Sequence, residues 1–102
     1  MAKSLVIFVS SFFIISSNAY SQDSSKGEKL FKACISCHGA QGLGDSSQEA
    51  PRISGQYDWY IYNSLVKFKK GERKNPKMMP YIKNLSDQDF KDLAAYVSGM
   101  KI

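Results

Sequence analysis

The sequence predicts an all-α fold in which three to four short helices are joined by long loops. Three stretches carry apolar residues at helical spacing between residues typical of helix ends, and no stretch alternates as a half-buried strand does. Two segments of about twelve residues between these stretches show no periodicity. Loops of that length are uncommon in a small domain unless they wrap around a bound group.

The first predicted helix begins near Ser25 and runs into two cysteines. The stretch Ser25-Lys26-Gly27-Glu28 has the S-x-x-E pattern of a capping box. The residues that follow at helical spacing are Gly27, Leu30, Phe31 and Cys34. Residues 39–51 contain three glycines and no apolar periodicity, so they are predicted to form a loop.

The second predicted helix opens at Gly55-Gln56 and closes at Gly71. One side of it is formed by Tyr57, Tyr60, Ile61, Ser64, Leu65 and Phe68. Residues 73–84 are then predicted to be irregular, because Pro76 and Pro80 prevent a continuous helix.

The last predicted helix has the strongest pattern. Ser86 is a favourable N-cap, and Asp87 and Asp89 place acids in the first turn. Gly99 ends the helix. Its apolar stripe consists of Phe90, Leu93, Ala94 and Val97.

The first 19 residues read as a secretory signal peptide. Lys3 provides a positive charge, residues 5–15 are apolar apart from two serines, and Ser17-Asn18-Ala19 offers small residues for cleavage. Cleavage after Ser21 is the alternative. The apolar run of 11 residues is short for a membrane span, which needs about 20. We therefore expect a periplasmic protein without stable membrane insertion, with one domain over residues 20–102.

A domain of roughly 80 residues has a small core and usually needs an additional stabilising element, such as disulfides, a metal or a cofactor. Loss of Lys3 leaves 13 basic and 9 acidic residues, a net charge of +4. This modest excess suits an acidic protein partner rather than nucleic acid, although simple solubility explains it equally well.

The segment Cys34-Ile35-Ser36-Cys37-His38 indicates that this stabilising element is a haem, because it has the C-x-x-C-H pattern of covalent haem attachment. Two thiols one helical turn apart can add to the two vinyl groups of a porphyrin, and the adjacent histidine can then bind the iron. A redox disulfide is a weaker reading, because no βαβ pattern surrounds the motif. A zinc site would need a fourth ligand, and the chain has no other cysteine or histidine. Two structural cysteines beside an incidental histidine are a further alternative, but it does not explain why the only histidine of the chain falls at this one place.

The iron's sixth ligand cannot be a second histidine of this chain, because His38 is the only one. Met78 and Met79 are the best candidates, since they lie in a proline-bracketed polar segment without an apolar stripe to join. Gap-filling in the core is the alternative role of these methionines. Lys74 and Lys77 are further candidate ligands.

The chain resembles the class I c-type cytochromes, in particular small bacterial monohaem members and single halves of dihaem members. The likeness rests on C-x-x-C-H-G at residues 34–39, P-x-[LI]-x-G-Q at residues 51–56, and Leu85-Ser86-Asp87. It extends to Tyr60, Leu65, Phe68, Gly71 and Leu93-Ala94-Ala95-Tyr96.

This resemblance implies one haem c attached at Cys34 and Cys37, with His38 and Met78 as iron ligands; a different branch of the family would place the ligand at Met79. It also implies that the Pro51 carbonyl accepts a hydrogen bond from His38. Gly27 and Phe31 should cross Leu93 and Tyr96.

The function expected from these residues is single-electron transfer, without catalytic residues. The haem pocket is expected to be lined by Tyr60, Leu65, Phe68 and Tyr96. Partners with acidic surfaces would dock on Lys67, Lys69, Lys70, Lys74 and Lys77. Two alternatives stay open: a subunit dedicated to one periplasmic dehydrogenase or oxidase, and an open-site peroxidase or gas sensor if methionine does not bind.

Overall fold

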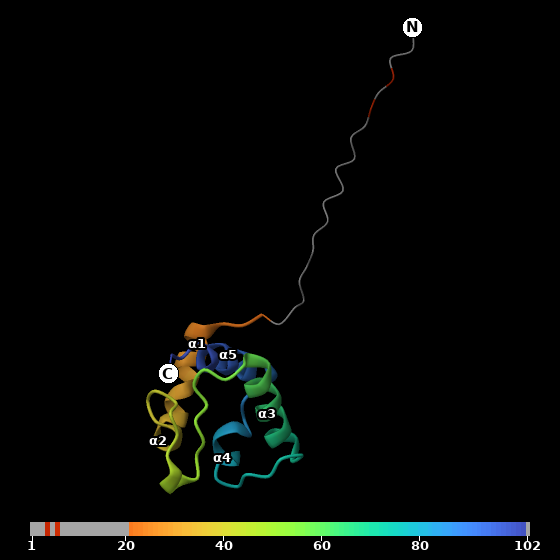
Figure 1. Ribbon diagram of the computed structural model, residues 1–102. Coiled ribbons are helices and arrows are strands. Elements are labelled where there is room, and N and C mark those ends of the chain that lie inside the picture. Colours follow the sequence, from red (N-terminus) through yellow and green to blue (C-terminus); the bar gives the residue numbers. More distant parts are fainter. Residues whose placement is uncertain (1–3, 5, 7–20, 102) are drawn as a thin grey trace.

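The computed structural model describes residues 4, 6 and 21–101. Within residues 21–101 the chain forms the helices α1 (Ser24–Phe31), α2 (Ile35–His38), α3 (Asp58–Lys70), α4 (Met79–Ile82) and α5 (Asp87–Ser98) (Figure 1). Short 3-10 turns span Lys32–Cys34 and Ser46–Gln48. An isolated bridge between Asp45 and Ala50 is the only β-type pairing found in this part of the chain. The predicted all-α class is confirmed, whereas the predicted signal segment lies outside the described residues except at positions 4 and 6.

The helices form a frame with α1 and α5 crossing at one end. α3 packs against α5 and descends on one side, α2 lies on the other side, and α4 lies opposite the crossing (Figure 1). No helix within the described residues is both long enough and apolar enough to cross a membrane. The long segments 39–57 and 71–78 connect the members of this frame.

The buried core joins four of the helices. Its members are Phe31, Ile61, Leu65, Ile82, Phe90, Leu93, Ala94 and Val97. The α5 stripe predicted from the sequence is therefore buried as expected.

The crossing of α1 and α5 depends on Gly27. A Cβ atom at this position would lie 2.0 Å from the Asp92 carbonyl oxygen and 2.9 Å from the Tyr96 Cβ atom. One turn later, the rings of Phe31 and Tyr96 pack with centroids 5.4 Å apart. The crossing implied by the family resemblance is confirmed, and the missing side chain of Gly27 allows the two backbones to touch.

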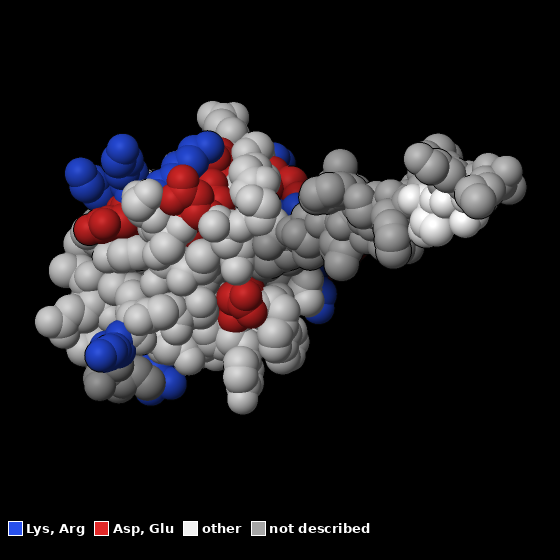
Figure 2. Space-filling model, turned by 90° about the horizontal axis from the view of Figure 1, so that it is seen from above, with Lys and Arg blue, Asp and Glu red and all other residues white. Residues whose placement is uncertain are grey.

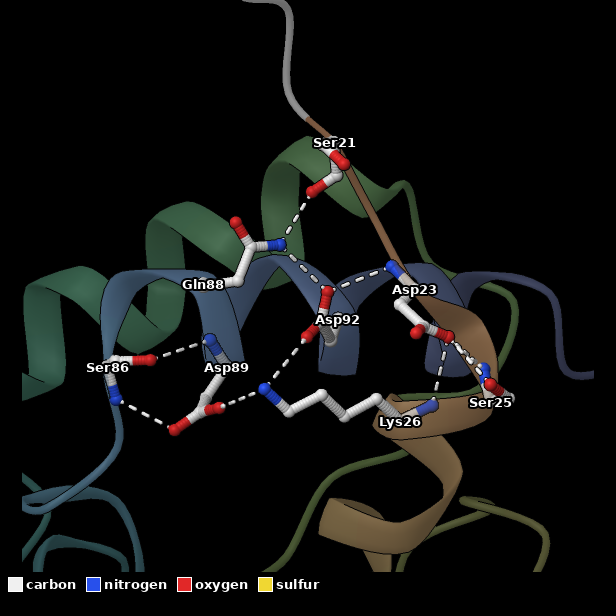
Figure 3. A network of polar contacts seen from close by, with 8 residues as sticks. All are labelled: Ser21, Asp23, Ser25, Lys26, Ser86, Gln88, Asp89 and Asp92. Atoms are coloured by element: carbon white, nitrogen blue, oxygen red, sulfur yellow. Dashed lines mark hydrogen bonds and ion pairs between the residues drawn. The ribbon is translucent and has the colours of Figure 1, made fainter.

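A polar network fastens the start of the domain to α5 (Figure 3). The buried Asp92 carboxylate accepts hydrogen bonds from the Asp23 backbone N–H at 2.9 Å and from the Gln88 amide at 2.9 Å. Gln88 also donates to the Ser21 carbonyl at 2.7 Å, and Lys26 lies 4.0 Å from Asp92. Asp92 thus has donors on several sides that compensate for its burial.

The capping box predicted at Ser25 was wrong. Asp23 caps α1 instead, and its carboxylate accepts hydrogen bonds from the backbone N–H groups of Ser25 and Lys26. The Ser25 hydroxyl donates to the same carboxylate at 2.7 Å. A charged acceptor two residues earlier outcompetes the serine hydroxyl for the free amides of the first turn.

The N-terminus of α5 was predicted correctly and carries a full capping box. The Ser86 hydroxyl accepts from the Asp89 N–H at 3.1 Å, and the Asp89 carboxylate accepts from the Ser86 N–H at 3.0 Å. These hydrogen bonds, led by the one from the Ser86 backbone, lower the pKa of Asp89. Tyr62 of α3 donates a hydrogen bond to Asp87, which joins the two helices at the same end.

The boundaries of the middle of the chain differ partly from expectation. α3 ends at Gly71 as predicted, but it begins at Asp58, because Tyr57 still has an extended backbone. The segment 73–84 was predicted to be irregular, yet it contains the single turn α4 with Pro80 in its first turn. Proline is tolerated there because the first amides of a helix have no intrahelical partner.

We predict that Gly27→Ala lowers the free energy of unfolding by about 1–3 kcal/mol or more, because the new methyl group would overlap backbone atoms of α5. Gly99→Ala is the matched control, since the nearest atom to its new Cβ atom lies 3.4 Å away. Denaturant unfolding of the two variants checks this. Equal stability of the two variants would contradict the close crossing.

We predict that Asp89→Asn changes the acid dependence of stability. The pKa of Asp89 is lower in the folded chain than its ordinary value of 3.8, so its stabilisation is present above that value and is lost as the pH falls through the folded pKa. The melting temperature of the variant should be a few degrees lower at neutral pH and should converge with that of the parent in acid. Glu28→Gln is the control, because it removes one negative charge from a residue that does not cap a helix. Parallel melting curves at all pH values would contradict the prediction.

Candidate functional site

The candidate site centres on His38, the last residue of α2. Its side chain is buried, and Nδ1 lies 2.9 Å from the carbonyl oxygen of Pro51. A carbonyl can only accept a hydrogen bond, so Nδ1 is the donor and carries a proton. The hydrogen bond implied by the family resemblance is present, and it leaves Nε2 as the nitrogen that can bind a metal.

The loop after α2 folds back tightly to bring Pro51 to His38. The Gly44 N–H donates to the His38 carbonyl at 2.8 Å. Gly44 has a φ of 89°, and a Cβ atom there would lie 2.7 Å from the Ala50 carbonyl oxygen and the Arg52 nitrogen. Glycine is therefore required where the two arms of the loop meet.

His38 faces a cavity of about 830 Å³, within the size range of cofactor sites. Tyr60, Leu65 and Phe68 line it, as predicted from the sequence. Tyr96, which was also predicted to line it, does not; its ring packs on Phe31 at the helix crossing. The other apolar lining residues include Phe31, Leu43, Ile53, Ile61, Ile82, Leu93 and Val97.

Both cysteines border this region. Cys34 lines the large cavity, and Cys37 lines a smaller one of about 70 Å³ that shares Cys34, His38 and Met78 with it. Both thiols are free. Burial raises the pKa of the Cys34 thiol, and the nearby Cys37 adds to the effect. The C-x-x-C-H segment thus presents two thiols and an imidazole to one connected space.

The two neighbouring methionines lie differently. Both pack against the hydrophobic core, but Met78 lines both cavities and Met79 lines neither. Asn75 holds the segment in place, because its side-chain oxygen accepts from the backbone N–H groups of Lys77 at 3.1 Å and Met78 at 3.3 Å. Met78 therefore lines the same space as His38, and Met79 does not.

The cavity also has a polar side that the sequence did not reveal. Arg73 lines it, donates to the Ser64 hydroxyl at 3.2 Å and lies 4.4 Å from the Phe68 ring centroid. Arg52 and Gln56 line it as well. The sequence shows that Arg73 follows the end of α3, but no pattern in it indicates that the side chain points into the cavity.

These residues fit a haem. An imidazole nitrogen and a thioether sulfur are a known ligand pair for haem iron, and they come here from α2 and from the residue before α4. The apolar walls suit a porphyrin ring, the thiols suit its vinyl groups, and the arginines suit its carboxylates.

Comparison with known proteins identifies this arrangement. Residues 24–101 match the family model described as Cytochrome c. Cytochrome c-554(548) of Halomonas halodenitrificans is 34% identical over 82 residues, which cover 78% of this chain and 98% of that protein. A thiosulfate dehydrogenase electron acceptor of Stutzerimonas stutzeri is 37% identical over 68 residues, covering 67% of this chain and 32% of that protein.

A solved structure has the same fold. Reduced cytochrome c4 from Pseudomonas stutzeri superposes with a TM-score of 0.71 at 28% identity, covering 76% of this chain and 48% of that chain. The chain therefore spans nearly all of one relative and half or less of the other two.

Proposed function

Because this chain belongs to the cytochrome c family and carries a covalently bound haem c, we propose that it is a periplasmic single-electron carrier whose iron is bound by His38 and Met78. The observation that carries the proposal is that His38 and Met78 line the same cavity from different elements. If His38 and Met78 both held the iron, no position would be left for a substrate, and the chemistry that the haem would supply is the transfer of one electron.

Each residue of the site has a role in this function. The Cys34 and Cys37 thiols would form the thioether bonds, and the Pro51 carbonyl orients His38 for ligation. The haem, when bound, supplies the one-electron chemistry of its iron. The apolar walls exclude water, and together with a methionine ligand this favours the reduced state and a positive midpoint potential.

The polar side of the cavity supports the same proposal. Arg52, Arg73 and Gln56 offer donors to the two carboxylates of a haem. Arg73 is held by Ser64 and Phe68, so its guanidinium is already oriented.

Docking on an acidic partner would use only part of the predicted lysine group. Lys69 donates to the Leu85 carbonyl and lies 5.6 Å from the Phe90 ring centroid, so it is engaged with the edge of α5. Lys77 borders the small cavity at Cys37 and lies 3.9 Å from Glu49. On the face seen in Figure 2, basic and acidic side chains mix along one edge, and no stripe of one sign crosses it. Lys67, Lys70, Lys74 and Lys77 remain the proposed docking group.

The periplasmic location follows from the proposed signal peptide. Residues 1–19 would be removed after Ala19, or after Ser21 in the alternative. The mature chain, residues 20–102, would then acquire its haem outside the cytoplasm.

A second candidate function is that of an electron-transfer subunit dedicated to one periplasmic dehydrogenase. It is favoured by the 37% identity to a protein named thiosulfate dehydrogenase electron acceptor. Stable co-purification with a large enzyme would distinguish this role from that of a diffusing carrier.

We predict that Met78→Ala in the holoprotein abolishes the far-red charge-transfer band of the ferric state. It should also lower the midpoint potential by on the order of 0.1 V, because a water or an empty site would replace the thioether. Optical spectra and protein-film voltammetry measure both effects.

Met79→Ala is the matched control and should keep the band and the potential, because Met79 does not line the cavity that His38 faces. Loss of the band in Met79→Ala alone would move the ligand to Met79. A parent protein without the band would favour the open-site alternative, a peroxidase or gas sensor.

We predict that oxidation of the reduced holoprotein by the anion hexacyanoferrate(III) slows as salt is added, because the salt screens its attraction to the lysines. Lys74→Gln/Lys77→Gln should be about two- to fivefold slower at low ionic strength and equal to the parent at high ionic strength. Lys29→Gln/Lys101→Gln, with the same charge change elsewhere, should differ less. Stopped-flow kinetics without any salt effect would contradict the docking role.

A further inference from the structure

Three large aromatic side chains lie exposed together at the start of α3. Tyr57, Trp59 and Tyr60 have 73%, 58% and 44% of their surface exposed. The rings of Tyr57 and Trp59 stack with centroids 5.8 Å apart, and Trp59 meets Tyr60 edge-on at 6.1 Å. We call these three residues the aromatic patch. Contiguous exposed apolar surface of this kind marks interaction sites on soluble proteins.

The aromatic patch is continuous with the haem cavity. Tyr60 lines the cavity, whereas Tyr57 and Trp59 do not. Consecutive ring contacts therefore lead from the cavity wall to the protein surface. A protein that covers the patch would approach the haem closely.

The patch carries almost no charge. Asp58 is the only charged residue in positions 53–66, and its carboxylate accepts a hydrogen bond from the Trp59 N–H at 2.7 Å. The other end of α3 carries Lys67, Lys69 and Lys70. Two copies of a chain with a formal net charge of +5, or +4 without Lys3, repel each other. Contact through an uncharged surface keeps this repulsion lowest.

The size of the patch indicates how long such a contact lasts. With roughly 200 Å² for each aromatic side chain, the exposed fractions amount to about 350 Å². A stable complex buries about 800 Å² on each partner. The patch alone therefore supports a brief encounter rather than a lasting dimer.

We propose that the aromatic patch is the contact through which a second copy of this chain docks transiently, so that an electron passes from a reduced to an oxidised copy. One electron leaves the first copy and enters the second, and each ends in the state in which the other began. This inference rests on the proposed carrier function. It gives the chain a means of passing electrons along a population of identical carriers.

The test is electron self-exchange in partly reduced mature holoprotein, measured from the concentration dependence of NMR line widths. Tyr57→Ser/Trp59→Gln should lower the second-order rate constant at least about tenfold, because both side chains lie outside the cavity and only the contact is lost. Trp59→Lys should slow the exchange as well, and added salt should partly restore it.

Lys29→Gln/Lys101→Gln, which removes two positive charges outside both the aromatic patch and the proposed lysine docking group, is the matched control, and its rate should stay within about threefold of the parent. An exchange rate of Tyr57→Ser/Trp59→Gln equal to that of the parent would overturn the proposal. So would a larger loss in the lysine variant than in the aromatic variant.

A second measurement is independent of electron transfer. In fully reduced protein, raising the concentration should shift the indole N–H signal of Trp59 more than backbone signals of α1. Absence of a concentration-dependent shift would count against docking of two copies. Reversible voltammetry of parent and variants separates the two proposals, because a holoprotein that cannot cycle reversibly refutes the carrier function itself.

Discussion

The hydrogen bond between His38 and the Pro51 carbonyl is the interaction on which the arrangement of the site depends. It engages Nδ1 with the Pro51 carbonyl and therefore leaves Nε2 as the ring nitrogen that can bind a metal. It also ties the end of α2 to the far arm of the loop, a return that Gly44 makes possible by bringing the two arms into backbone contact. From Pro51 the chain continues through Ile53 and Gln56 along the cavity wall to α3. One contact thus sets both the chemistry of the imidazole and the shape of the space around it.

Local signals made much of the fold predictable. α5 could be derived almost completely, because its capping box, apolar stripe and closing glycine all lie within one short stretch. The end of α3 at Gly71 was equally local. Two other helix starts could not be predicted from the sequence. Asp23 caps α1 in place of Ser25, and Pro80 lies in the first turn of α4 instead of preventing a helix.

The sequence predicted those parts of the candidate site in which only one residue of the required type is available. A single histidine beside two cysteines indicated the attachment segment, but two adjacent methionines are equivalent until the backbone shows which one turns inward. The same holds for Tyr96, whose helical position allows it to face either the cavity or α1, and for Arg73, which folds back over Phe68. Such choices depend on tertiary contacts between distant segments, which no local pattern encodes.

The polar network that joins Asp23 to Asp92 has a consequence for the order of folding. Its partners are 69 positions apart, so the frame closes only when nearly the whole chain has come together, and the entropy of that closure opposes it. Cys34 and Cys37 lie near the leading end of the chain and α5 lies near the trailing end. If the chain is exported as proposed, the thiols emerge well before the helix that completes the frame. If a porphyrin were attached to the thiols at that stage, it would provide an apolar surface against which α3 and α5 could pack as they form.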